Sequence, residues 1–176
     1  IKKSNLSYTM KNKLLLIIIF ISPLFSFKYD DPVITTDDLN LLTGNKWTGT
    51  LSYLDYSGNK EVSIAAEVIV LKTDDADAFI FVNEYPDEPK ANNTDTIRIE
   101  ENGKKFGNET VTERITEADG MIKIVTSEEG TDNEKHAFIK HTYIISSSRY
   151  TVRKEVRFEG ESNFITRHTY VFARAD

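Results

Sequence analysis

The sequence contains no cysteine. This excludes a disulfide, a thiol nucleophile, an iron–sulfur cluster and a cysteine-ligated zinc site, and we expect no lipid anchor on a cysteine after a signal sequence. Glycine and proline are also sparse, with 8 and 4 residues among 176, which excludes a collagen-like or low-complexity chain. The length suits one domain of ordinary size, or at most two small ones, stabilised by a core alone.

Basic residues are in the minority. The chain has 22 lysines and arginines against 28 aspartates and glutamates, for a net charge of −6. A nucleic-acid-binding protein normally presents a basic face, so we expect no nucleic-acid partner. The charge is uneven, because residues 27–134 are strongly acidic and residues 135–176 are basic. We expect these charges to pair across neighbouring strands.

The start of the chain predicts a secretory signal. A basic segment, 10–13, precedes an apolar run over 14–27, which is the order found in signal peptides. The run is shorter than the roughly 20 residues of a membrane-spanning helix; the alternative is a buried core helix. We expect translation to begin at Met10 and cleavage to follow the small residue Ser26, so that residues 1–26 are removed. The mature protein is then secreted or periplasmic, with no transmembrane segment.

A short helix is expected before a long series of strands. In the N-terminal segment 27–45, Thr35 and Thr36 are helix-capping residues and Gly44 is a helix stop, as is usual at helix ends. From Lys46 onward the hydrophobic period changes to two, and turn residues recur roughly every 8–12 residues. These features predict a single β-domain over 46–176.

Turn signals organise this domain as an antiparallel meander. Asn102-Gly103 and Asp119-Gly120 are hairpin signals, and polar loops are expected at 85–93 and 128–135. The last three strands are expected at 137–146, 150–159 and 163–174. No segment has the length and period of a crossover helix, which excludes a parallel sheet. Because closure removes exposed edges, the pattern predicts an all-β barrel of about 8–10 strands.

Trp47 lies between Gly44 and Gly49 where the first strand opens, and Arg174 ends the last strand. In this arrangement the chain resembles the lipocalin-like (calycin) β-barrel superfamily. Within it, residues 47–58 and the loop over 85–89 make the chain most similar to secreted bacterial barrels of unassigned function. The resemblance implies a barrel closed by its first and last strands, with Arg174 packed over Trp47.

Side chains alternate between the two faces of a strand, so the more aromatic faces are expected to line the lumen. The candidate lumen residues are Trp47, Tyr53, Phe79, Phe81, His141, Tyr143, Lys154, His168 and Tyr170. His141 and His168 could meet there and bind a metal, haem or a polar ligand head, or could be hydrogen-bonded core or rim residues. Lys154 could pair with a ligand carboxylate or extend its amine to the rim.

No pattern indicates catalysis or a resident metal. The sequence has 3 histidines but no zinc-binding spacing and no nucleophile elbow. Segments 74–77 and 128–134 lack the spacing of a calcium loop. Glu113 is expected to point inward between Val111 and Ile115, but carboxylates are abundant. We therefore assign no catalytic residue, metal ligand or cofactor, and an enzyme is the least favoured class.

Two functions stay open. With 10 Phe, 8 Tyr and 1 Trp, the chain has enough aromatic side chains to line a pocket as well as fill a core. We expect an exported protein that binds a small apolar or amphiphilic molecule in the barrel lumen. The alternative is a solid barrel whose 85–94 loop contacts a protein partner. An enclosed, aromatic-lined cavity of about 300 Å³ or more would favour the first function, and a packed lumen would contradict it.

Overall fold

The computed structural model describes residues 31–55, 58 and 60–175. The chain from Asp31 onward forms one compact unit. The predicted start at Met10, the signal sequence and its cleavage site after Ser26 lie outside the described residues. Within the described residues, no helix has the length and apolar character needed to cross a bilayer.

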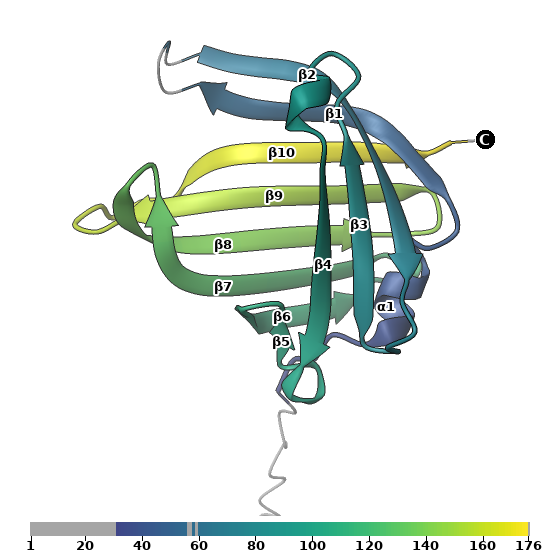
Figure 1. Ribbon diagram of the computed structural model, residues 1–176. Helices are drawn as coiled ribbons and strands as arrows, with labels where there is room; N and C mark the ends of the chain where they lie inside the picture. Colours follow the sequence, from purple (N-terminus) through teal and green to yellow (C-terminus); the bar gives the residue numbers. More distant parts are fainter. Residues whose placement is uncertain (1–30, 56–57, 59, 176) are drawn as a thin grey trace, which may run out of the picture. The chain divides into compact units, whose positions relative to one another are not determined.

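Ten strands of the described chain form a closed antiparallel barrel, in which neighbours in sequence are also neighbours in space (Figure 1). They are β1 (Lys46–Asp55), β2 (Lys60–Lys72), β3 (Ala78–Glu84), β4 (Asn93–Glu100), β5 (Lys105–Phe106), β6 (Glu109–Thr116), β7 (Ile122–Asp132), β8 (Lys135–Ile145), β9 (Arg149–Phe158) and β10 (Ile165–Arg174). The last strand pairs with the first and closes the barrel. The predicted all-β meander that closes into a barrel is confirmed.

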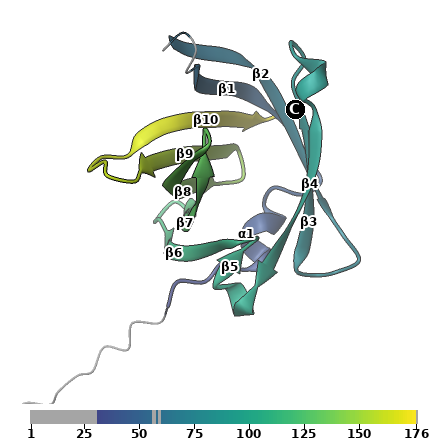
Figure 2. The same ribbon diagram turned by 60° about the vertical axis from the view of Figure 1, so that its left-hand side comes forward.

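One short α-helix, α1 (Thr36–Asn40), lies at one end of the barrel beside the ends of β3 and β6 (Figures 1 and 2). Ile34 and Leu39 from this region belong to the same buried core as Phe79. The indole nitrogen of Trp47 donates a hydrogen bond of 2.9 Å to the carbonyl oxygen of Leu42. Side chains therefore fill this end, which we call the closed end.

The seam between β1 and β10 places Trp47 and Arg174 directly opposite each other. The Trp47 ring is fully buried and meets the edge of the Tyr150 ring, with centroids 6.2 Å apart. The exposed Arg174 donates to the carbonyl oxygen of Ser147 at 3.5 Å. The implied packing of the Arg174 guanidinium over the indole stays a prediction.

The loops agree with the turn signals in part. Hairpins occur at both predicted Asx-Gly sites, where a 3-10 turn, η2 (Glu101–Gly103), joins β4 to β5 and a turn over 117–121 joins β6 to β7. A second 3-10 turn, η1 (Pro89–Ala91), lies in the predicted 85–93 loop. The loop predicted at 128–135 is wrong, because β7 and β8 run through it. They are joined by Asn133 and Glu134, whose φ angles of 48° and 62° suit a tight hairpin turn.

Candidate functional site

The register of β8, β9, β10 and β1 arranges the inward side chains in rows around the barrel. The end of the barrel opposite the closed end is called the open end. The row nearest to it consists of His141, Lys154, His168 and Tyr53. The next row is Tyr143, Val152, Tyr170 and Leu51, and the row nearest the closed end is Ile145, Tyr150, Phe172 and Gly49. Directly opposed residues on antiparallel strands share a face. The pairing alone therefore brings both inward histidines to the same level of the lumen.

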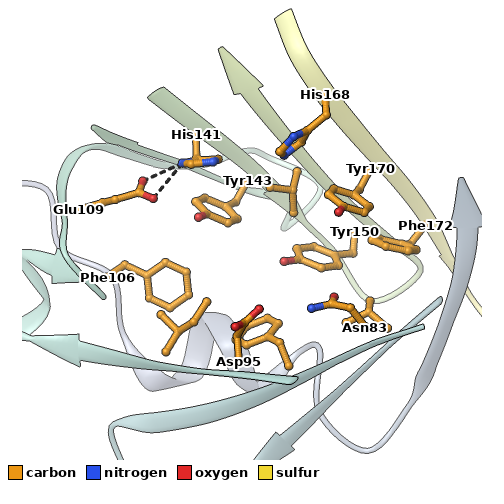
Figure 3. Close-up of a pocket in the computed structure, with 14 residues that line it drawn as sticks. Asn83, Asp95, Phe106, Glu109, His141, Tyr143, Tyr150, His168, Tyr170 and Phe172 are labelled. Carbon is orange, nitrogen blue, oxygen red and sulfur yellow. Dashed lines mark hydrogen bonds and ion pairs between the residues drawn. The ribbon is translucent and has the colours of Figure 1, made fainter. Parts of the chain in front are cut away.

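These rows border a cavity of about 280 Å³ (Figure 3). Six aromatic rings line it: Phe81, Phe106, Tyr143, Tyr150, Tyr170 and Phe172. Its polar lining consists of Asn83, Asp95, Glu109, His141 and His168. The volume is slightly below the expected value of about 300 Å³, and the cavity is partly open rather than enclosed. It is nearly twice that of the roughly 150 Å³ apolar cavity that holds benzene. A molecule of one or two rings therefore matches the available space.

The aromatic wall is ordered by stacking. The ring of Phe172 lies parallel to those of Tyr150 and Tyr170, with centroid distances of 5.7 and 5.6 Å. On another side of the cavity, Phe106 and Tyr143 meet edge to face at 5.5 Å. Offset-stacked and edge-to-face pairs stabilise rings beyond the area that they bury. The lining is accordingly held in place before any ligand arrives.

A carboxylate and an imidazole of the cavity lining are bonded to each other. Nδ1 of His141 lies 2.9 Å from each carboxylate oxygen of Glu109, and the buried hydroxyl of Thr126 also donates to Glu109. Glu109 begins β6 next to a bulge between Val111 and Glu113. The bulge turns Glu113 outward, where it pairs with Lys123, so the expectation that Glu113 points inward is wrong.

His168 is a neutral group at the edge of the cavity. Burial lowers the pKa of His168 to about 4, and His141, Lys154 and Arg167 act in the same direction, while Asp132 opposes them. The ring centroids of His168 and His141 are 6.4 Å apart. Near neutral pH the His168 imidazole is therefore uncharged, the state in which it accepts a hydrogen bond or ligates a metal.

Three tyrosine hydroxyls add hydrogen-bonding capacity. Burial raises the pKa of Tyr143, Tyr150 and Tyr170, so all three stay protonated. Figure 3 shows the hydroxyl ends of Tyr143 and Tyr150 directed into the space between the walls. The hydroxyls of Tyr170 and Tyr85 share a hydrogen bond of 2.8 Å. Tyr85 follows β3, so this bond ties the start of the 85–92 loop to β10.

The nine predicted lumen residues fall into three groups. Five line the cavity: Phe81, His141, Tyr143, His168 and Tyr170. Trp47 and Phe79 are buried in the core that includes the closed end. Tyr53 and Lys154 border a separate hollow at the open end. The structure places these nine residues at different depths along the barrel, which the sequence pattern did not indicate.

At the open end, Lys154 has a partner within the protein. Its Nζ donates to Oδ1 of Asp132 at 2.9 Å, and Nε of Arg167 donates to Oδ2 at 3.0 Å. Burial alone would raise the pKa of Asp132, but Lys154 and Arg167 outweigh it and hold the pKa below its usual value. The predicted pairing of Lys154 with a ligand carboxylate would have to compete with this ion pair.

Sequence reasoning missed the polar residues on the other side of the lumen. Asp95 is exposed and also lines the cavity, so it lies at the mouth. Its alternation with Ile97 and Ile99 is a signal that could have placed it inward. Glu109 precedes the bulge of β6 and shares a face with Val111, so the same alternation could have placed it inward.

Metal and cofactor ligands are few. In the part of the chain that the structure describes, no group of three His, Asp or Glu side chains could hold a metal ion. His168 is the residue best suited to contact the iron of a planar cofactor, because its imidazole is neutral and faces the cavity. Haem iron commonly takes such an axial ligand.

The barrel has a counterpart among solved structures. The chain resembles the crystal structure of Rv2717c from M. tuberculosis with a TM-score of 0.55 and 12% identity, over 82% of this chain and 100% of that one. The two proteins share the barrel fold. A protein of unknown function from the DUF3598 family of Nostoc punctiforme PCC 73102 gives a TM-score of 0.35 and 13% identity, over 82% of this chain and 50% of that one. No family model and no curated protein matches the sequence.

Proposed function

We propose that this is an exported binding protein whose barrel holds a small amphiphilic molecule of one or two rings. The observation that carries the proposal is the cavity of about 280 Å³, with six aromatic rings and a polar side formed by Glu109, His141 and His168. Ligand sites in proteins combine such an apolar lining with a few placed polar groups. We also propose that the barrel belongs to the lipocalin-like superfamily, on the strength of residues 44–49.

The alternative is a barrel that acts through its surface. Its main support was the predicted loop after β3, which contains the exposed turn η1. Tyr85 fixes that loop to β10 through Tyr170, a residue of the cavity wall. The loop therefore has a structural role at the lumen, and the cavity favours small-molecule binding over a solid-cored interaction module.

A matched pair of variants tests the proposal. Val152 lines the cavity, whereas Val171 on the neighbouring strand is exposed on the outside. We expect Val152→Phe to weaken binding of 1-naphthalenemethanol at least tenfold in titration calorimetry, because the added ring occupies the ligand space. Val171→Phe should leave the affinity unchanged, and circular dichroism checks that both variants fold. Equal effects of the two variants, or no binding to the unmodified protein, would contradict the proposal.

Native mass spectrometry of protein purified from its own source complements this test. A retained small molecule that is lost from Val152→Phe would support lumen binding and give the ligand mass. The export part of the proposal has its own measurement. N-terminal sequencing of the protein recovered outside the cytoplasm should begin at Phe27, the residue after the expected cleavage site, and recovery only inside the cytoplasm would contradict export.

A second candidate function rests on His168. A neutral imidazole that faces an aromatic cavity suits a haem ligand, although haem is larger than a two-ring molecule and would also have to occupy the open mouth. Haem reconstitution should then give a Soret band that is lost in His168→Ala. The band should persist in His136→Ala, because His136 is an exposed histidine outside the cavity. Absence of the band in reconstituted protein would exclude this candidate.

A further inference from the structure

The charge of the cavity lining narrows the class of ligand. Among the described residues that line it, the carboxylates are Asp95 and Glu109, and no lysine or arginine is present. Asp95 projects from β4 at the mouth, while Glu109 projects from β6 (Figure 3). A ligand carboxylate or phosphate placed here would meet like charge, with no lysine or arginine of the lining to compensate it.

The nearest basic side chains are already engaged. Lys154 and Arg167 both bond Asp132 in the open-end hollow, and Arg167 also donates to the carbonyl oxygen of Leu54 at 2.7 Å. Turning either cation toward the cavity would leave the largely buried Asp132 carboxylate with less compensation, which is costly. The lumen is thus poorly equipped for the fatty-acid type of ligand that an inward lysine would suggest.

The same lining is favourable for a positive charge. The negative faces of aromatic rings attract ammonium groups, and Phe106 and Tyr143 lie among the rings next to Glu109 (Figure 3). An ionised carboxylate offers about four acceptor sites, so Glu109 can accept a ligand N–H besides the hydroxyl of Thr126 and the ring N–H of His141. His168 is neutral near pH 7 and does not repel a cation.

We infer that the lumen binds an organic amine, in which a body of one or two rings lies against the tyrosine and phenylalanine wall and an ammonium group faces Glu109 and Asp95. This inference rests on the proposed function and adds the charge of the ligand. It also orients the ligand, with its polar head toward β4 and β6 and its ring toward β9 and β10.

Three probes of matched shape test the inference. Titration calorimetry at low ionic strength and near neutral pH compares 1-naphthylmethylamine, 1-naphthalenemethanol and 1-naphthoate. The amine is expected to bind about tenfold more tightly than the alcohol, and the carboxylate most weakly. Added salt should reduce the preference for the amine, since Asp95 is exposed and its charge is screened.

Variants assign the preference to the two carboxylates. Glu109→Gln and Asp95→Asn should each lower the ratio of amine affinity to alcohol affinity severalfold. Glu113→Gln is the matched control, because Glu113 belongs to the same strand but lies outside the cavity. Because Asp95 is exposed, we expect Asp95→Asn to fold, so it still measures the effect of a carboxylate on the affinity ratio if Glu109→Gln does not fold. Circular dichroism identifies that case.

The outcomes separate the inference from the function on which it rests. Binding of the alcohol with equal or weaker binding of the amine would overturn the inference and leave lumen binding standing. An amine preference that Glu113→Gln reduces as much as Glu109→Gln would also overturn it. Failure of all three probes to bind would overturn the proposed function together with the inference.

Discussion

Both carboxylate oxygens of Glu109 lie 2.9 Å from Nδ1 of His141. The two residues come from β6 and β8, which are not neighbours in the barrel, and β7 between them contributes Thr126 to the same carboxylate. Three adjacent strands are therefore joined by one hydrogen-bonded group inside the lumen. Such a network both fixes the imidazole and holds the wall of the cavity together.

Glu109→Ala should destabilise the protein by about 1–3 kcal/mol, because the Thr126 hydroxyl and the His141 N–H lose their acceptor in a buried setting. Thr126 is fully buried, so solvent cannot replace the carboxylate at its hydroxyl. Urea unfolding gives the free energy. Glu113→Ala is the control, with an expected loss below about 1 kcal/mol because its ion pair with Lys123 is half-exposed. Similar losses for the two variants would show that the network contributes nothing.

The barrel could be predicted from the sequence because its signals are local. Alternation of aromatic and polar residues identified the three long strands after residue 135, and Asx-Gly pairs identified two hairpins. Strand period and turn chemistry are properties of a few consecutive residues. Closure followed from the number of strands, since an open meander of this length would leave two bare edges.

Site residues could be predicted only where the alternation of side chains along a strand shows which of them point inward. His141 and His168 were expected on inward faces where they could meet, because both alternate with aromatic residues in long strands. Glu109 lies before the bulge of β6 and keeps the face of Val111, but as the first residue of the strand it was overlooked. The bulge after Val111 explains the wrong expectation for Glu113, because a bulge changes which face the following residues occupy. The partner of Lys154 was missed for another reason. Asp132 was assigned to a loop, although it ends β7.

Gly49 lies in β1 where the backbone of β10 leaves no room for a side chain. A Cβ at this position would lie 1.9 Å from the carbonyl oxygen of Val171 and 2.8 Å from its carbon. Gly49→Ala should therefore push the two closing strands apart and destabilise the barrel by about 1–3 kcal/mol or more, as overpacking does. Gly130→Ala is the control, because its Cβ would meet only side-chain atoms, the nearest of them Cδ1 of Ile139 at 3.4 Å. Thermal unfolding of both variants measures the difference, and equal melting temperatures would contradict the close-approach argument.

Asp38 and Arg114 connect α1 to the barrel wall. The guanidinium donates two hydrogen bonds to the carboxylate, at 2.7 and 2.9 Å, and Asp38 is almost fully buried. Burial raises the pKa of Asp38, but Arg114 and the backbone N–H of Thr35 outweigh it and lower the pKa below 3.8. Arg114→Met should cost about 3–5 kcal/mol, because it leaves a buried charge without its partner.

The double variant Asp38→Leu/Arg114→Met decides whether that cost is electrostatic. It removes the charge together with its partner, so we expect it to be more stable than Arg114→Met alone. Lys104→Met is a control for loss of a positive charge, since its ion pair with Asp31 is exposed. Chemical unfolding of the three variants gives the comparison. A double variant less stable than the single one would indicate that lost packing dominates.

His168 makes stability depend on pH. Its pKa is about 4 in the folded protein against 6.5 for an ordinary histidine. Between these two pH values the unfolded chain therefore binds a proton at His168 that the folded protein does not bind. The stabilisation is fully present above about pH 6.5 and is lost as the pH falls toward about 4, by up to about 3 kcal/mol. Urea unfolding across this range should show the loss in the unmodified protein.

A variant without a titrating group isolates this contribution. His168→Gln is neutral at every pH, so its unfolding free energy should fall less steeply between about pH 6.5 and 4. His136→Gln removes an exposed histidine and should keep the slope of the unmodified protein. Comparing slopes rather than absolute stabilities cancels the packing change at position 168 and the carboxylates that titrate in all three proteins. Identical slopes in the three proteins would mean that His168 takes up its proton in the folded barrel as readily as in the unfolded chain.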